Sequence, residues 1–325
     1  MIDPFGRAVT YLRMSVTDRC NLRCTYCMAE KMTFLPKQQI LTIEEMAEIG
    51  ETFSTLGVKK IRLTGGEPLI RKGVMTLVER LGSLETLDEL VMTTNGLLLP
   101  EYAGPLKAAG VRRLNISIDS LKPDRFREIS RTGDLGQVLK GISAAQQAEF
   151  ENIKLNAVIL AGINDDEILD LAKFAVDGGM DITFIEEMPL GDIDSHNRAE
   201  TQVFSEKVRE ILSREYSLIS SAETTGGPAR YFRIQGRGQK IGFISPISDN
   251  FCASCNRVRL TVEGQLLLCL GNENALDLKK VVRRDPGNRE ALISAIHSAI
   301  ERKPEKHHFD PDRVDIVRFM NMTGG

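Results

Sequence analysis

The six cysteines of this chain fall into two groups of three that lie far apart in the sequence. The first trio is Cys20, Cys24 and Cys27, and the second trio is Cys252, Cys255 and Cys269. Iron–sulfur clusters are held by cysteine thiolates and normally take four of them. Each trio supplies only three, so the pattern predicts two clusters, each with one iron free to bind a ligand that is not protein.

Disulfides and zinc are the alternatives to this interpretation. Disulfide scaffolds are typical of short secreted chains, whereas this chain has 325 residues and begins Met-Ile-Asp-Pro-Phe-Gly-Arg, without an apolar signal segment. Zinc sites usually close with four ligands, and the four histidines lie well away from both trios in the sequence. The first trio therefore favours a cluster, while the spacing of Cys252 and Cys255 is also typical of zinc.

The composition is ordinary for a globular enzyme, with 42% apolar residues, 27% charged residues and a net charge of −3. This balance carries no signature of binding to a nucleic-acid polymer, so any anion must be bound by local arginines and lysines. No apolar run is long enough to cross a bilayer, and we expect no membrane partner. Unpaired cysteines without an export signal predict a cytoplasmic location.

Short runs rich in Val, Ile, Leu and Thr alternate with amphipathic stretches over the first part of the chain. The predicted strands are 10–17, 60–64, 89–94, 113–119, 154–160 and 181–188. The predicted helices are 42–56, 73–82, 101–109, 137–150 and 165–176. Six alternating units imply a parallel sheet and fall short of the eight units of a complete barrel. The expected fold class is therefore α/β, an incomplete (β/α)6 barrel.

The pattern changes near residue 192, after which hairpin-like runs follow one helix. These runs are 230–234, 240–247, 257–261 and 265–270, and the last of them carries Cys269. A final helix is expected over 288–302. We therefore expect residues 1–192 to form the partial barrel and residues 193–325 to form a β-rich extension that carries the second cluster.

Residues suited to chemistry follow several of the predicted strands. Gly65-Gly66-Glu67-Pro68 follows the second strand, Thr93-Thr94-Asn95-Gly96 ends the third, and Ser117 with Asp119 ends the fourth. Each segment alone is also typical of a simple turn or strand end. Because ligands of parallel barrels gather at the carboxyl ends of the strands, the series as a whole predicts a site there, next to the first trio.

The first trio, with Tyr26 inside it, and the Gly-Gly-Glu-Pro segment resemble the radical S-adenosylmethionine superfamily. The second trio, Arg257-Val258-Arg259 and the terminal Gly324-Gly325 narrow the resemblance to the GTP 3′,8-cyclase family of molybdenum cofactor biosynthesis, over nearly the whole chain. The resemblance implies two 4Fe-4S clusters and S-adenosylmethionine as cofactors. It places S-adenosylmethionine against Tyr26, Gly65, Gly66, Glu67, Ser117 and Met188.

The same resemblance implies that GTP is the substrate and that its guanine binds the second cluster. The matching GTP-binding positions are Arg13, Arg62, Thr93, Lys154, Arg257, Val258 and Arg259. Arg13 and Arg62 also fall inside predicted strands, where a charge is costly unless an anion accompanies it. A catalytic role is implied for Arg257, Arg259, Gly324 and Gly325, although a frayed terminus is the usual fate of a chain end.

The family further implies a reductant protein for the clusters, a cyclic pyranopterin monophosphate synthase that takes the product, and a homodimer. Two other functions remain as hypotheses. One is a radical enzyme that modifies a peptide, although such relatives usually carry more than six cysteines and have no need of the Arg257 and Arg259 pair. The other is a zinc-stabilised binding module on an α/β scaffold.

Overall fold

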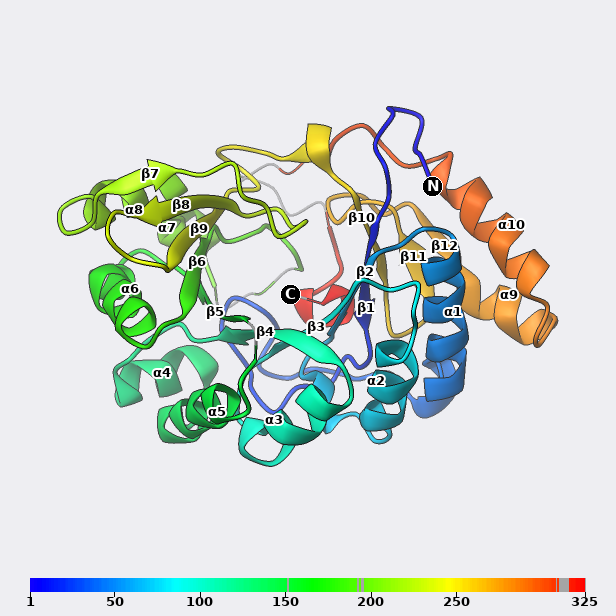
Figure 1. The fold of residues 1–325 in the computed structure, drawn as a ribbon, viewed down its shortest axis with the longest axis horizontal. Coiled ribbons are helices and arrows are strands. Elements are labelled where there is room, and N and C mark those ends of the chain that lie inside the picture. Colours follow the sequence, from blue (N-terminus) through cyan, green and yellow to red (C-terminus); the bar gives the residue numbers. More distant parts are fainter. Residues whose placement is uncertain (151, 192, 194–195, 308, 310–315, 325) are drawn as a thin grey trace.

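The computed structural model describes residues 1–150, 152–191, 193, 196–307, 309 and 316–324, and its central feature is one sheet with the strand order β12-β11-β10-β1-β2-β3-β4-β5-β6-β9-β8-β7. Figure 1 shows this sheet curving around a central space, with helices on its outer side. The first six strands are parallel neighbours: β1 (Tyr11–Ser15), β2 (Lys60–Thr64), β3 (Glu89–Thr94), β4 (Val111–Ser117), β5 (Asn152–Val158) and β6 (Asp181–Ile185).

The helices that follow these strands confirm the alternation expected from the sequence. They are α1 (Ile43–Thr55), α2 (Val74–Gly82), α3 (Leu99–Ala108), α4 (Pro123–Ser130), α5 (Leu135–Gln147) and α6 (Ile168–Asp177). Helix α4 was not predicted. At the start of α1, Thr42 and Glu45 form a capping box, in which each side chain accepts a hydrogen bond from the backbone N–H of the other residue.

Strand alternation divides the sheet into an apolar outer face and a polar inner face. In β1, Leu12 and Met14 belong to the hydrophobic core, whereas Tyr11 and Arg13 line the central cavity. Strand β2 repeats this division, with Ile61 and Leu63 in the core and Lys60, Arg62 and Thr64 at the cavity. Because successive side chains of a strand point to opposite faces, the apolar residues pack under the helices while the charged residues face inward.

The carboxyl-terminal part of the chain extends the same sheet at both of its edges. Strand β9 lies parallel to β6, and β10 lies parallel to β1. The remaining pairs are antiparallel. The strands are β7 (Leu218–Ser220), β8 (Arg230–Ile234), β9 (Lys240–Ile244), β10 (Arg257–Leu260), β11 (Gln265–Leu267) and β12 (Ala275–Asp277). Because β11 ends at Leu267, Cys269 lies just beyond that strand and not on it as the sequence suggested.

The remaining helices follow β6 in the sequence, and the last of them lies in the space that the curved sheet surrounds. They are α7 (Arg198–Thr201), α8 (Ser205–Leu212), α9 (Leu278–Arg284), α10 (Arg289–Ile300) and α11 (Met320–Thr323). In Figure 1 the red α11 lies in the middle of the molecule, next to β1. Asn321 of α11 donates a hydrogen bond to the carbonyl of Asp18, at 2.7 Å, so this end of the chain reaches the loop that leads to the first trio.

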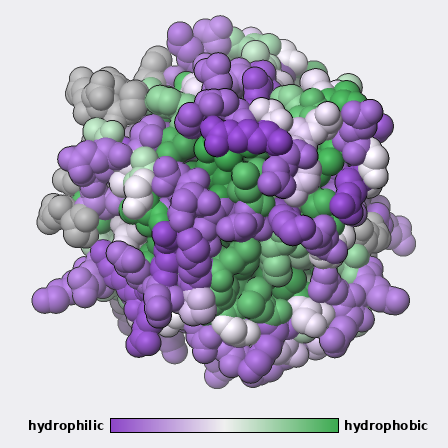
Figure 2. All heavy atoms as spheres, turned by 90° about the vertical axis from the view of Figure 1, so that its left-hand side faces the viewer, coloured by the Kyte–Doolittle hydropathy of each residue, from purple (hydrophilic) through white to green (hydrophobic). Residues whose placement is uncertain are grey.

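The outer surface is mainly polar. Figure 2 shows a hydrophilic face interrupted by apolar patches. The large apolar side chains that are exposed are Ile2, Phe5, Ile70, Phe204, Ile219 and Val317. Among the helices of the described residues, none combines the length and apolar character needed to span a membrane.

Candidate active site

One cavity inside the curved sheet brings together residues that are far apart in the sequence. All six cysteines line it, so the two trios share one space. The other predicted site residues that line it are Arg13, Tyr26, Arg62, Gly65, Gly66, Thr93, Ser117, Lys154, Met188, Arg257, Val258 and Arg259. Glu67 and Gly324 do not line it, and Gly325 lies outside the described residues.

The loop of the first trio is fixed by the glycine pair that follows β2. The N–H of Gly66 donates to the carbonyl of Thr17 at 2.8 Å, and the N–H of Glu67 donates to the carbonyl of Arg19 at 2.8 Å. A Cβ atom on Gly66 would lie 2.1 Å from the Arg19 carbonyl oxygen, which is too close for any side chain. Gly66 therefore allows β2 to pack directly against the segment that carries Cys20.

The carboxylate of Glu67 is buried and points toward the end of β3. It accepts hydrogen bonds from the N–H of Leu69 at 3.0 Å, the hydroxyl of Thr94 at 2.9 Å and the N–H of Asn95 at 2.7 Å. The side-chain amide of Asn95 in turn lies 3.8 Å from the sulfur of Cys20. Glu67 therefore contacts the first trio through Asn95, and burial raises its own pKa to about 7.

Tyr26 is held from the opposite side by Asp119. Its hydroxyl donates to the Asp119 carboxylate at 2.7 Å, and the other carboxylate oxygen accepts from the N–H of Val158 at 2.9 Å. This second contact lies where β4 and β5 end, two residues before the ends expected from the sequence. Burial of the carboxylate raises the pKa of Asp119 to about 6.

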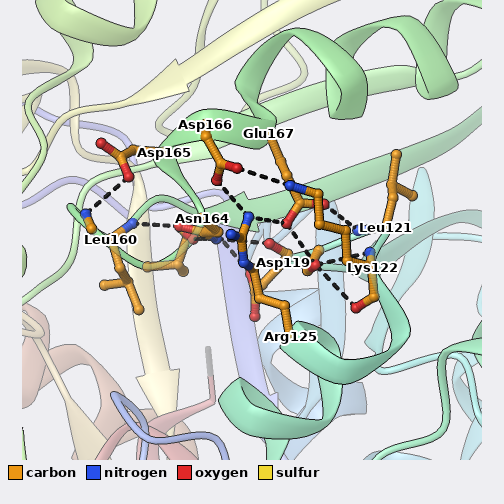
Figure 3. A network of polar contacts seen from close by, with 12 residues as sticks. Asp119, Leu121, Lys122, Arg125, Leu160, Asn164, Asp165, Asp166 and Glu167 are labelled. Atoms are coloured by element: carbon orange, nitrogen blue, oxygen red, sulfur yellow. Dashed lines mark hydrogen bonds and ion pairs between the residues drawn. The ribbon is translucent and has the colours of Figure 1, made fainter.

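A buried polar network supports Asp119 from behind, as Figure 3 shows. The side-chain amide of Asn164 donates to the carbonyls of Asp119 at 2.7 Å and Val158 at 2.9 Å. Glu167, which is fully buried, accepts from the N–H of Leu121 at 2.8 Å and forms an ion pair with Arg125 at 2.7 Å. Because each of these polar groups has a hydrogen-bond partner, this part of the fold is rigid. The hydrogen bond from Tyr26 to Asp119 therefore ties Tyr26 to a rigid part of the fold.

Another buried network lies just before Met188, at the end of β6. Glu187 lines the cavity, and its carboxylate contacts His196 at 2.6 Å, Arg198 at 3.1 Å and Thr201 at 3.0 Å. The neighbouring carboxylate of Glu186 accepts hydrogen bonds from residues 205, 247 and 248. These contacts fix the backbone that presents Met188 to the cavity.

The thiols of the first trio are costly to ionise in the protein alone. Burial raises the pKa of Cys20 to about 11, that of Cys27 to about 12 and that of Cys24 well above its usual range. The negative charge of Asp119 adds to this effect at Cys24 and Cys27. Bound iron would have to supply the positive charge that stabilises these three thiolates.

The second trio has a different electrostatic environment. Cys252 begins a short 3-10 turn and Cys255 directly follows it, and the N–H of Cys255 donates to the carbonyl of Cys252 at 3.1 Å. Burial opposes the ionisation of Cys255, but Arg257 and Lys303 outweigh it and lower the pKa of this thiol. At Cys269 burial prevails and raises the pKa. Cations, rather than carboxylates, therefore neighbour this trio.

Three arginines form a row across adjacent strands on the inner face of the sheet. The register pairs Arg259 of β10 with Arg13 of β1, and Arg13 with Arg62 of β2. In this arginine row (Arg259, Arg13 and Arg62), burial together with the neighbouring cations lowers the pKa of Arg13 to about 10 and that of Arg259 well below its usual range. Like charges opposite each other on a sheet are destabilising, so the row is suited to an anion.

Several cavity residues were missed by the sequence interpretation although strand periodicity could have found them. Tyr11 and Lys60 precede Arg13 and Arg62 by two residues, and so face the same cavity. Tyr11 accepts a hydrogen bond from Arg62 at 2.6 Å. Although burial raises its pKa, the charges of Arg62, Arg13 and Lys60 lower the pKa of Tyr11 to about 6.

The end of the chain contacts the arginine row directly. The carbonyl of Gly324 accepts hydrogen bonds from Arg259 at 2.6 Å and from Arg13 at 3.4 Å. Gly324 has a φ of +78°, and a Cβ atom there would lie 2.1 Å from Cγ2 of Thr64. Both its backbone conformation and its surroundings therefore require glycine.

The donors around the two trios fit iron–sulfur clusters. Each trio offers three thiols at the shared cavity, and the sulfur of Cys20 also accepts a hydrogen bond from the N–H of Leu22 at 3.3 Å. Hydrogen bonds to sulfur are typical of cluster sites. Among the described residues, no three His, Cys, Asp or Glu side chains gather closely enough to hold a single metal ion. In a 4Fe-4S cluster each thiolate binds its own iron, so the cysteines need not converge on one point.

Comparison with known families gives two adjoining matches. The model of the radical SAM superfamily matches residues 14–175, and the model described as Molybdenum Cofactor Synthesis C matches residues 180–309. Among solved structures, Streptococcus suis SuiB aligns with a TM-score of 0.61 at 14% identity, over 88% of this chain and 68% of SuiB. A SuiB structure with S-adenosylmethionine aligns with a TM-score of 0.57. At this identity the likeness concerns the fold alone.

Curated relatives match over the full length of the chain. The GTP 3′,8-cyclase of Ectopseudomonas mendocina is 56% identical over 326 residues, which cover 100% of this chain and 98% of the relative. The enzyme of the same name from Pseudomonas syringae pv. syringae is 58% identical, and GTP 3′,8-cyclase 2 of Pseudomonas aeruginosa is 55% identical, both with the same coverage. The chain therefore belongs to the GTP 3′,8-cyclase family of radical S-adenosylmethionine enzymes.

Proposed function

We propose that this protein cyclises GTP to (8S)-3′,8-cyclo-7,8-dihydroguanosine 5′-triphosphate, the first step of molybdenum cofactor biosynthesis. The observation that carries this proposal is the shared cavity, which is lined by both cysteine trios and by the arginine row. The source of the radical and the polyanionic substrate each need a binding site. The cysteine trios and the arginine row offer both sites in one cavity. Membership of the GTP 3′,8-cyclase family supports the same activity.

The proposed architecture is an incomplete (β/α)6 barrel made by residues 1–192, with a β-rich extension made by residues 193–325. The six parallel strands β1 to β6 support the barrel part, and the strands β7 to β12 support the extension. The first trio would hold one 4Fe-4S cluster in the barrel, and the second trio would hold another in the extension. Each cluster would keep one iron free for a small molecule.

S-adenosylmethionine would bind beside the first trio. When bound beside a reduced cluster, it would supply the chemistry that removes the 3′ hydrogen of GTP, with one electron used to break its C5′–S bond; formation of the C3′–C8 bond would then need one further electron, from the reductant, and a proton to complete the dihydro product. Gly65, Gly66, Ser117 and Met188 would line its methionine side, and Tyr26, fixed by Asp119, would lie against the adenine. Glu67 would act indirectly, because its carboxylate is taken up by three donors at the end of β3.

GTP would bind between the second trio and the arginine row. The guanine would bind to the free iron of the second cluster. The triphosphate carries about four negative charges at neutral pH and would be met by Arg13, Arg62, Arg257, Arg259 and Lys154. The hydroxyl of Thr93, which accepts a hydrogen bond from Arg62 at 2.9 Å, and the strand residue Val258 would complete this site.

We assign the catalytic contribution of the protein to Arg257, Arg259 and the Gly324-Gly325 end of the chain. Arg259 already binds the carbonyl of Gly324, so the tail and the substrate arginines form one unit. This unit would hold the ribose in reach of the radical and exclude water from it.

The remaining proposals concern the setting of the reaction. We expect a cytoplasmic homodimer that takes electrons from a reductant protein. The cyclised triphosphate would pass to a cyclic pyranopterin monophosphate synthase.

Anaerobic incubation with dithionite, S-adenosylmethionine and each of the four nucleoside triphosphates in turn tests the proposed function. We expect 5′-deoxyadenosine and a cyclised nucleotide with GTP, and no cyclised product with ATP, CTP or UTP. Iron and sulfide analysis of the same preparation distinguishes the zinc alternative. About one zinc per trio without sulfide would refute the cluster assignment, and 5′-deoxyadenosine without a cyclised nucleotide would refute the substrate.

A further inference from the structure

We propose that Lys303 is a positioning residue that holds a positive charge against the second cluster and raises its reduction potential. This inference rests on the proposed function, because it assumes a cluster at the second trio. It concerns a residue that neither the cysteine pattern nor the substrate-binding arginines include.

The lysine is buried at the back of the second trio. Its side chain is almost fully enclosed, with 3% exposure, and its ammonium group donates to the sulfur of Cys255 at 3.6 Å and to the carbonyl of Leu268 at 2.8 Å. Leu268 directly precedes Cys269, so both contacts lie on the trio. Within the described part of the chain, no carboxylate forms an ion pair with Lys303, although a buried charge normally requires one. Thiolates of the cluster would supply that negative charge.

Hydrogen bonds from Arg7, near the start of the sequence, hold the segment that directly follows this lysine. Arg7, paired with Asp3 at 2.6 Å, donates to the carbonyl of Cys252 at 2.9 Å. The same guanidinium donates to the carbonyls of Pro304 at 2.6 Å and Glu305 at 2.5 Å. The residues that follow Lys303 are therefore tied to the trio through one buried arginine. Such support indicates a side chain whose position matters, because outer partners of metal ligands orient and tune the site.

The charge has a definite effect on the cluster. Reduction adds one negative charge to the cluster, and a nearby buried cation stabilises that added charge. A hydrogen bond from a charged donor to a ligand sulfur acts in the same direction. The first trio receives a neutral amide from Asn95 at 3.8 Å instead, and has Asp119 and Glu67 close by. Lys303 thus raises the potential of the second cluster selectively.

The test is a redox titration of the anaerobically reconstituted holoenzyme, followed by electron paramagnetic resonance. The signal of the second cluster is assigned in a background in which Cys20, Cys24 and Cys27 are all serine. Lys303→Met removes the charge, Lys303→Arg keeps it, and Lys306→Met is the matched control, because Lys306 is an exposed lysine three residues later. We expect Lys303→Met to lower the ratio of reduced to oxidised second cluster at fixed potential by tenfold or more, about 59 mV for one electron. Lys303→Arg and Lys306→Met should stay within threefold of the wild type.

The outcomes separate this inference from the proposed function. An unchanged potential in Lys303→Met with both clusters present would overturn the inference. Loss of the second cluster in Lys303→Met and in Lys303→Arg alike would also overturn it, because the residue would then be needed for shape and not for charge. Loss in Lys303→Met alone, with a wild-type potential in Lys303→Arg, would support it. If the wild-type protein itself held no cluster at the second trio, the proposed function would fail instead.

Discussion

The two cysteine trios each offer three thiols to one cavity, but the charges around them differ. Around the first trio lie Asp119 and Glu67, which add to burial in raising the pKa of its thiols, while Arg23 at Cys20 and Arg198 at Cys27 offset only part of this rise. Around the second trio, Arg257 and Lys303 act on Cys255 and lower its pKa. The difference therefore arises from neighbouring residues and not from the metal ligands.

This contrast indicates a division of work between the two proposed clusters. A cluster among carboxylates is harder to reduce and is a stronger electron donor once reduced, which suits cleavage of a sulfonium. A site among cations attracts a triphosphate and tolerates its charge. The arginine row continues the positive region away from the second trio, since Arg259 follows Arg257 on β10 and pairs with Arg13. The shared cavity thus has a reducing end and an anion-binding end.

Replacing one cysteine in either trio should have the largest effect on activity. The two variants should also differ most clearly in which reaction they lose. Cys24→Ser should abolish both 5′-deoxyadenosine formation and GTP cyclisation, because the radical source is lost. Cys269→Ser should abolish cyclisation while part of the S-adenosylmethionine cleavage survives. Each variant should retain about four iron atoms per chain, measured against about eight in the wild type. Loss of both clusters in either variant would show that the trios depend on each other for folding, and the division of work would then fail.

A smaller effect is expected at the arginine row. Arg259→Ala removes a half-buried charged donor from the substrate site and from the carbonyl of Gly324, at 2.6 Å. A hydrogen bond from a charged group contributes about 1.5–3 kcal/mol, so kcat/KM for GTP should fall about 10- to 100-fold. Cleavage of S-adenosylmethionine driven by dithionite should change much less. Arg284→Ala is the control, since Arg284 is largely exposed and pairs only with Asp285 among the described residues. Equal losses in both reactions would place Arg259 outside the substrate site.

The end of the chain tests whether the tail belongs to the anion-binding end. Gly324→Ala would strain a φ of +78° and force Cβ against Cγ2 of Thr64, so the tail should move away from Arg259. We expect kcat for GTP to fall about tenfold, equivalent to about 1.4 kcal/mol. Thr64→Ser in the same chain removes Cγ2 and should restore part of the loss.

Gly287→Ala is the matched control for this prediction. Gly287 has a φ of +77°, and nothing lies within 4 Å of an added Cβ, so it carries the backbone strain without the clash. Its turnover should equal that of the wild type. If Gly324→Ala were fully active, the tail would have no part in the reaction, whatever its contacts.

Much of the fold could be predicted from local pattern. The strands β2, β3 and β8 were predicted with their observed bounds. Helix α4 was missed although Pro123 at its first turn and the apolar pair Phe126 and Ile129 carry the expected signals. The ends of β4 and β5 were misplaced because the side chain of Asp119, and not a backbone carbonyl, accepts from Val158.

The site was predicted less completely, since its geometry depends on contacts distant in sequence. Motif resemblance identified the six cysteines and twelve other residues that line the cavity, and alternation along the strands would have added Tyr11 and Lys60. No local signal could show that β10 pairs with β1, or that Gly324 reaches Arg259. The burial of Lys303 against Cys255 likewise follows only from the folded chain, because one lies after α10 and the other before β10.

The smallest expected effect concerns the acidic surroundings of the first trio and is a dependence of stability on pH. The folded protein raises the pKa of Asp119 to about 6 from an ordinary value of 3.8, so between these values it binds more protons than the unfolded chain. Stability from this group is therefore greatest at low pH and is lost as pH rises through about 6. Asp119→Asn removes the titration, and its free energy of unfolding should improve relative to the wild type by on the order of 1–3 kcal/mol between pH 4.5 and pH 7.

Urea unfolding of the cluster-free protein measures this difference, and Asp124→Asn, at an exposed position on α4, should show none. A constant offset between wild type and Asp119→Asn at both pH values would mean that Asp119 is not held as a costly buried charge, and the negative character assigned to the first trio would then rest on Glu67 alone.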